Sequence, residues 1–178
     1  MTARGVSLRL AKITMAASMA AFADLVAIDN VIDYGTNFSF VEHVLSMDTT
    51  FATNTLRWRA ITEPVLWHAA YWVIIIGEAL TGAAYTIGAL MLARAFRASG
   101  ETFNQSKHFV YLATALGFLV WFFGFMVVGG EWFSMWQSTQ WNGQEAAFRF
   151  YVAVLGVGVF IALQDRDLPR QGSGARQR

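Results

Sequence analysis

The stretch from residue 67 to residue 92, WHAAYWVIIIGEALTGAAYTIGALML, decides the fold. It is almost unbrokenly apolar and carries one acid, Glu78, near its middle. A helix rises about 1.5 Å per residue and the hydrocarbon core of a bilayer is about 30 Å thick, so about 20 apolar residues cross it. The stretch is long enough, and we therefore predict that it is a transmembrane helix.

The small and polar residues of this stretch share one helical face, because they follow alternating steps of three and four residues. Such a face packs against other helices in a membrane. An ionised acid at the bilayer centre costs at least about 2.5 kcal/mol, so Glu78 is expected on this packed side. The face comprises His68, Tyr71, Ile75, Glu78, Gly82, Tyr85 and Ala89.

The composition of the chain is that of a membrane protein. Of its 178 residues, 56% are hydrophobic and 14% are charged, whereas soluble domains carry about 25% charged residues. The absence of cysteine excludes disulfides, thiolate metal ligands and cysteine nucleophiles. A net charge of +1 with scattered bases does not provide the concentrated basic surface that nucleic-acid binding needs.

Three further apolar segments predict an all-α, up-down-up-down bundle of four transmembrane helices within a single domain, residues 1–165. The first begins like a signal peptide, and AFA at residues 21–23 fits a cleavage site. Its apolar run continues past that site, so we expect it to be retained. The predicted spans are residues 11–30, 66–92, 109–129 and 146–163.

The segment between the first two spans is polar, irregular and too long for a simple turn. Helical spacing of its apolar residues predicts a short amphipathic helix lying on the bilayer surface. The segment is therefore expected to form a structured first loop outside the membrane, packed against the tryptophan-rich loop before the fourth span. The residues with this spacing are Phe38, Val41, Val44 and Leu45.

The distribution of basic residues predicts the orientation. Ten of the 13 Lys and Arg lie in the N-terminal segment, the second loop and the C-terminal tail. The remaining three, Arg57, Arg59 and Arg149, lie on the other side. The positive-inside rule then places both termini in the cytoplasm. Residues 166–178, which lack an apolar pattern, are predicted to form a disordered cytoplasmic tail.

Five strings of the sequence are distinctive: DYGTNF (33–38), LSMDTTF (45–51), WRAI (58–61), GGEWF (129–133) and WNGQ (141–144). Together they resemble a bacterial family of predicted small integral membrane proteins catalogued as a domain of unknown function. The resemblance covers most of the chain except its two ends. It implies a four-helix protein of the bacterial inner membrane, and it carries over no catalytic residue.

Four charged residues in or near the predicted spans form a candidate intramembrane network: Asp24, Glu78, Glu131 and Arg149. Asp24 lies about 10 Å below the outer end of its span by helical rise. Arg149 enters from the same side and can reach inward along its stem. We therefore expect an Asp24–Arg149 pair, with Glu131 as a competing partner for the arginine.

Glu78 lies deeper and has no obvious base near it. It is expected to be protonated or hydrogen-bonded to a hydroxyl such as that of Tyr85 or Thr81. One interpretation of these groups is a proton or cation path, or a polar pocket for a quinone head group. The other is a buried network that fixes helix pairing.

The histidines give little sign of a metal or haem site. His43 and His68 lie on the outer side and could meet near Glu42 or Asp48 as nitrogen and oxygen ligands. There is no His-x-x-x-His spacing, however, and haem would need two imidazoles at one depth, whereas His108 lies at the opposite surface. We interpret them as interfacial, hydrogen-bonding residues.

Tryptophans and amides gather on the outer side. They suit the binding of a ligand or partner protein at the mouth of the bundle. Tryptophans also anchor helices at membrane interfaces, although anchoring does not call for the amides. Both interpretations stay open. The candidate surface comprises Trp58, Trp132, Trp136, Gln137, Trp141, Asn142 and Gln144.

No enzymatic motif is present: there is no Gly-x-Ser-x-Gly, phosphate-binding loop or dinucleotide fingerprint. The leading hypothesis is a non-enzymatic accessory or interaction subunit of a membrane complex, or a homo-oligomer in the lipid bilayer. The alternative is a redox- or proton-coupled protein with a quinone-like ligand at its intramembrane carboxylates. A small pore formed by oligomers is a third option. No pattern identifies a cofactor.

Overall fold

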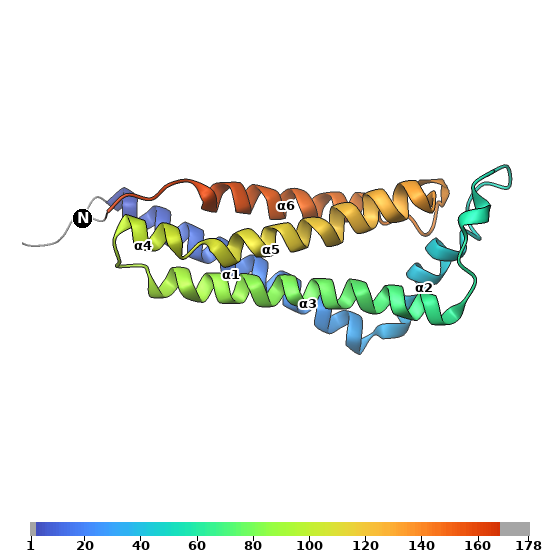
Figure 1. Cartoon of the computed structure of the whole chain (residues 1–178), viewed down its shortest axis with the longest axis horizontal. Helices are drawn as coiled ribbons and strands as arrows, with labels where there is room; N and C mark the ends of the chain where they lie inside the picture. The colour runs from blue at the N-terminus through green and yellow to red at the C-terminus, as the bar shows by residue number, and fades with distance from the viewer. Residues whose placement is uncertain (1–2, 168–178) are drawn as a thin grey trace, which may run out of the picture.

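The computed structural model describes residues 3–167, and every regular element in that range is helical. The long elements are α1 (Ala3–Ile32), α3 (Pro64–Arg94), α5 (His108–Phe118) continued by η2 (Leu119–Trp132), and α6 (Gln144–Ala162). They lie side by side, and each runs back along the one before it (Figure 1). Four helices are long and apolar enough to cross a membrane, which confirms the predicted all-α membrane fold.

The third span differs from the prediction in its winding. It is α-helical only to Phe118, and η2 continues it as a π-helix. At its end the amide of Phe133 donates to the carbonyl of Val128, five residues earlier, at 3.0 Å. The change from hydrogen bonds four residues apart to bonds five residues apart does not alter the apolar character of the segment. The sequence therefore does not predict it. π-Turns often occur at functional sites.

Small residues bring α1 and α3 into close contact. Ala16, Ala20 and Ala23 are buried in the core between the helices. Gly82 is the tightest point, because a β-carbon there would lie 2.9 Å from the backbone nitrogen of Asp24 and would overlap its side chain. The main core therefore depends on residues that let two backbones approach each other.

The first loop contains the expected helix, α2 (Tyr34–Ser46). Its apolar residues Val41, Val44 and Leu45 are buried in a second core with Tyr71 of α3 and Met135. The expectation that this helix lies on the bilayer surface is therefore corrected: its apolar side packs on the protein. Protein atoms are available there because α3 extends past the end of α1.

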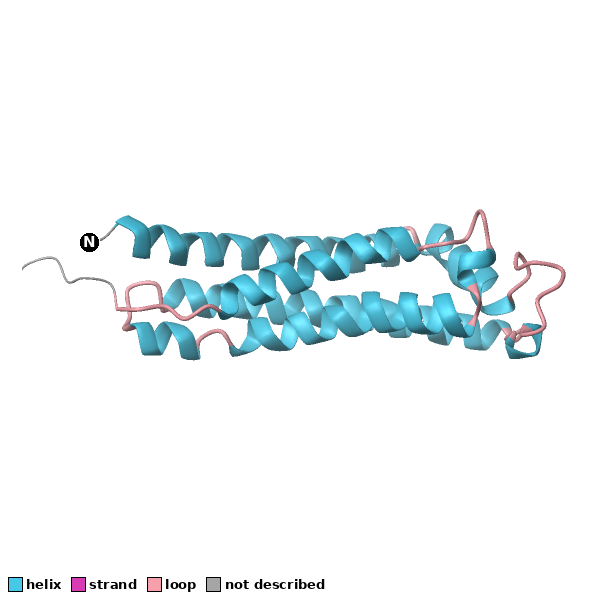
Figure 2. Ribbon diagram, turned by 90° about the horizontal axis from the view of Figure 1, so that it is seen from above, coloured by secondary structure: helices cyan, strands magenta, loops and turns pink. Residues whose placement is uncertain are grey.

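Two loops form a cap at the α2 end of the bundle, which Figure 2 shows as the end with most loop structure. The first loop includes η1 (Arg57–Arg59), and the tryptophan-rich loop includes η3 (Met135–Gln137). Thr49 Oγ1 donates to Ser138 Oγ at 2.9 Å, and the amide of Phe51 donates to Gln137 Oε1 at 3.1 Å. Hydrogen bonds thus tie the two loops together.

The opposite end is closed by α4 (Gly100–Gln105) and by residues 163–167. Lys12 Nζ and Lys107 Nζ lie 2.5 and 2.7 Å from the same oxygen of Asp165, and all three side chains are buried. Arg9 donates to the carbonyl of Arg166 at 3.0 Å. These contacts, and a hydrogen bond from the amide of Gly100 to Asp167 Oδ1, hold residues 166 and 167 against the bundle at the start of the tail that the sequence predicts to be disordered. Residues 168–178 lie outside the described range.

Candidate functional site

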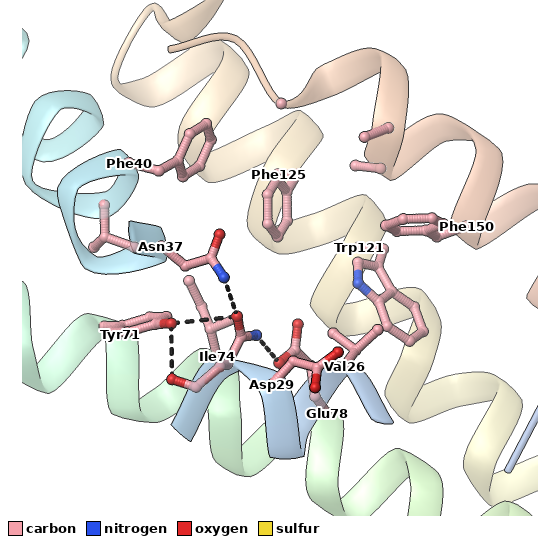
Figure 3. Close-up of a pocket in the computed structure, with 15 residues that line it drawn as sticks. Val26, Asp29, Asn37, Phe40, Tyr71, Ile74, Glu78, Trp121, Phe125 and Phe150 are labelled. Carbon is pink, nitrogen blue, oxygen red and sulfur yellow. Dashed lines mark hydrogen bonds between the residues drawn. The ribbon is translucent and has the colours of Figure 1, made fainter. Parts of the chain in front are cut away.

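A cavity of about 370 Å³ lies among the long helices, on the side of the bundle where α2 packs. α1, α2, α3, η2 and the start of α6 all contribute to its wall (Figure 3). Its polar lining residues are Asp29, Asn30, Asn37, Tyr71 and Glu78, and its aromatic ones include Phe40, Trp121, Phe125 and Phe150. The volume falls within the range of small-molecule sites.

Asn30 is the centre of the polar side of the cavity. Its amide nitrogen donates to Glu78 Oε2 at 2.6 Å, and its amide oxygen accepts from Asn37 Nδ2 at 2.7 Å. The hydroxyl of Tyr71 lies 3.2 Å from the same amide oxygen. Glu78 and Tyr71 are each 2% exposed. The other oxygen of Glu78, Oε1, has no hydrogen-bond partner among the described residues.

This arrangement corrects the expected partners of Glu78. Thr81 donates to the carbonyl of Gly77 in its own helix at 2.7 Å, as threonine hydroxyls in helices commonly do. The hydroxyl of Tyr85 shares a hydrogen bond of 3.1 Å with Thr114. The actual partner, Asn30, was missed, because the sequence does not give its depth relative to α3. An amide at the end of an apolar span was the only available signal.

The other charged candidates do not join Glu78. Asp24 Oδ2 accepts from Thr86 Oγ1 of α3 at 3.0 Å. Arg149 pairs with Glu145 one turn earlier on the exposed face of α6, so the expected Asp24–Arg149 pair is not formed. Glu131 is exposed at the end of η2. The position of Arg149 in its span predicts its depth, but it does not predict the rotation of α6 that turns the side chain away from the bundle.

An aromatic wall stands opposite the polar side. The ring of Trp121 lies 5.8 Å from that of Phe150, and Phe40 lies 5.9 Å from Phe125, measured between ring centroids. Trp121 is 1% exposed, and its indole nitrogen faces the cavity on the side of Asp29 (Figure 3). No acceptor among the described residues binds this N–H. The cavity therefore offers a ligand one hydrogen-bond donor, Trp121 Nε1, and one acceptor, Glu78 Oε1.

The two outer histidines have separate partners. His43 Nδ1 lies 2.7 Å from Asp48 Oδ2, and His68 Nδ1 lies 2.8 Å from the hydroxyl of Tyr34. Burial raises the pKa of the Tyr34 phenol above its ordinary value. Within residues 3–167 no group of three or more His, Cys, Asp or Glu could hold a metal ion.

The outer candidate residues divide into an exposed set and a structural set. Trp58, Trp132 and Trp136 are 72%, 48% and 51% exposed, and the guanidinium of Arg59 lies 4.5 Å from the ring of Trp132. We call these four residues the tryptophan surface. The others shape the loop: Gln137 binds Phe51, Trp141 stacks on His43, and Asn142 accepts from the amide of Gln144.

Comparison with known proteins places the chain in a family. The family described as a predicted small integral membrane protein matches residues 8–164, which include most of α1 and all of the other long helices. No curated protein and no solved structure matches the chain. The four membrane-capable helices agree with the family's description. The chain therefore belongs to the family of predicted small integral membrane proteins (DUF2165), which has no assigned function.

Proposed function

We propose that this protein binds a small amphipathic molecule inside its helix bundle. The observation that supports this most directly is the open oxygen of Glu78 in a cavity of about 370 Å³. Oε1 has no partner among the described residues, and Glu78 is largely screened from bulk water, so a hydrogen bond from a ligand would be electrostatically stronger there than at an exposed site. The apolar part of the ligand would lie against Phe125 and Phe150.

A purely structural network explains the cavity less well. The bonds from Asn30 to Glu78, Asn37 and Tyr71 do fix α1, α2 and α3 relative to one another. A network with only that role does not need a cavity beside it in which polar atoms are left accessible to a ligand. Here both Glu78 Oε1 and Trp121 Nε1 lack partners among the described residues.

The redox- or proton-coupled role suggested by the sequence is one form of this function. A quinone carbonyl could accept from Trp121 Nε1, and the hydroxyl of the reduced form could donate to Glu78. Hydrogen bonding of this kind selects a head group and leaves the apolar tail free.

Blocking the cavity tests the proposal. Ala146 lines the cavity but is exposed, so Ala146→Trp should fill the mouth without overpacking the core. Ala153→Trp is the matched control, because Ala153 is exposed on the same helix outside the cavity. We expect native mass spectrometry of the protein in mild detergent to show a small bound molecule in wild type and Ala153→Trp only. Equal occupancy in all three proteins would contradict the proposal.

A second candidate function is that of an accessory subunit, and the tryptophan surface favours it. Interface hot spots are enriched in Trp and Arg, and Trp58, Trp132 and Trp136 are exposed together with Arg59 beside them. Trp136→Ala should lower the recovery of a cross-linked partner without lowering the protein level. Trp72→Ala, which removes an exposed tryptophan from α3, should leave recovery unchanged. A second copy of this chain is an equally detectable partner.

For the location we propose the inner membrane of a bacterium, with both termini in the cytoplasm. The support is the distribution of basic residues along the sequence, since ten of the 13 lie in the N-terminal segment, the second loop and the C-terminal tail. The cap formed by the first loop and the tryptophan-rich loop would then face outward.

A further inference from the structure

The cavity contains two acids and no base. Asp29 and Glu78 both contribute to its lining, and no Lys, Arg or His is among the described residues that line it. The nearest candidate on α6, Arg149, is paired with Glu145 on the exposed face of that helix. Lys12 and Lys107 belong to the opposite end of the bundle. The polar side of the cavity is therefore negative whenever either carboxyl is ionised.

The chain treats its other buried acid differently. Asp165 is contacted by both Lys12 and Lys107 in a fully buried cluster. Glu78 is equally inaccessible, yet it receives one hydrogen bond from a neutral amide. Buried carboxyl groups are normally either protonated or paired with a cation. The cation missing at Glu78 can come from a molecule that enters the cavity.

The aromatic wall suits the same kind of molecule. Phe150, Phe40 and Phe125 contribute their rings to the wall, whereas Trp121, beside Phe150, turns its indole N–H edge toward the cavity (Figure 3). Cations are attracted to the faces of phenylalanine rings, and the attraction increases when the site excludes water. A neutral ligand gains only apolar contact from the same rings. Carboxyl groups and aromatic rings thus both favour positive charge.

We infer that the ligand of this cavity is a small organic cation: a molecule with a compact ammonium head near Glu78 and an apolar body against the aromatic wall. The inference rests on the proposed ligand-binding function and narrows its substrate class. It excludes a neutral quinone as the preferred ligand.

Two probes of the same shape isolate the effect of charge. Phenyltrimethylammonium and tert-butylbenzene differ only in having N⁺ or carbon at the branch point. Binding is read from the indole N–H resonance of Trp121 in the ¹⁵N-labelled full chain, assigned with Trp121→Phe. The chemical shift of this resonance changes when a probe binds in the cavity, and probe that only dissolves in the detergent does not change it.

We expect phenyltrimethylammonium to bind at least about tenfold more tightly than tert-butylbenzene. Glu78→Gln should remove about tenfold of the cation's affinity while leaving that of tert-butylbenzene unchanged. Glu145→Gln, which removes an exposed acid outside the cavity, should change neither. Asp29→Asn provides a second test that does not disturb the buried network, since Asp29 is exposed. Asp29→Asn should lower the affinity for phenyltrimethylammonium and leave the affinity for tert-butylbenzene unchanged.

The outcomes separate the two proposals. Equal affinity for both probes, tighter binding of duroquinone, or full cation affinity in both Glu78→Gln and Asp29→Asn overturns the cation assignment while leaving the ligand-binding function intact. If none of the three probes shifts the Trp121 resonance, the ligand-binding function fails together with the inference. Wild-type spectra elsewhere in each variant show that a loss of binding is not a loss of folding.

Discussion

At the scale of single residues, Asn30 explains how the bundle tolerates a buried acid. Its amide uses both ends, donating to Glu78 and accepting from Asn37 and Tyr71. An amide can do this because it carries a donor and an acceptor on one side chain. Asn30 therefore links α1 to both α2 and α3 through one side chain.

Asn30→Ala should lower the free energy of unfolding by about 1–3 kcal/mol, because it leaves the buried side chain of Glu78 without its partner. Equilibrium unfolding in mixed micelles measures the change. Gln140→Ala is the control, since Gln140 is an exposed loop residue, and it should have little effect. Equal losses in the two variants would show that the network does not stabilise the fold.

At the scale of elements, the pairing of α1 with α3 depends on backbone approach. The side chain of Asp24 occupies the space that a side chain at position 82 would need, and its second oxygen binds Thr86. Gly156 on α6 has open space around it. Adding the same methyl group at the two glycines therefore compares a tightly packed position, Gly82, with an unpacked one, Gly156.

Gly82→Ala should therefore destabilise the bundle by about 1–3 kcal/mol through overpacking. Gly156→Ala should be neutral or stabilise by up to about 1 kcal/mol, because alanine has the higher helix propensity. Thermal unfolding in detergent, followed by circular dichroism, compares them. Similar unfolding midpoints for the two variants would mean that α1 and α3 accommodate a side chain at position 82 without loss of stability.

At the scale of the whole molecule, the proposed orientation is testable because the chain contains no cysteine. Thr53 is exposed in the first loop, and Arg97 is exposed at the opposite end of the bundle. Single cysteines at these positions therefore mark the two sides of the membrane.

A membrane-impermeant maleimide should label Thr53→Cys in intact spheroplasts, whereas Arg97→Cys should react only after permeabilisation. The physical reason is the excess of basic residues at the Arg97 end, which resists translocation. The reverse pattern of labelling would overturn the orientation, although the positions of the helices would be unaffected.

The sequence by itself determined the membrane class, the four helices and the burial of Glu78. Apolar runs of sufficient length have few alternatives to a membrane helix, and the face containing Tyr71, Glu78 and Gly82 follows from the helical period. Those three residues are all buried, as that face predicts.

Only the tertiary structure decided which residues meet. The partner of Glu78, the exposure of Arg149 and the place of Trp121 in the cavity depend on how far each helix is shifted along its axis and rotated about it. Periodicity within one helix specifies neither quantity, because both are set by packing between helices. The same reason explains why Asp165, in a segment without an apolar pattern, proved to be buried between Lys12 and Lys107.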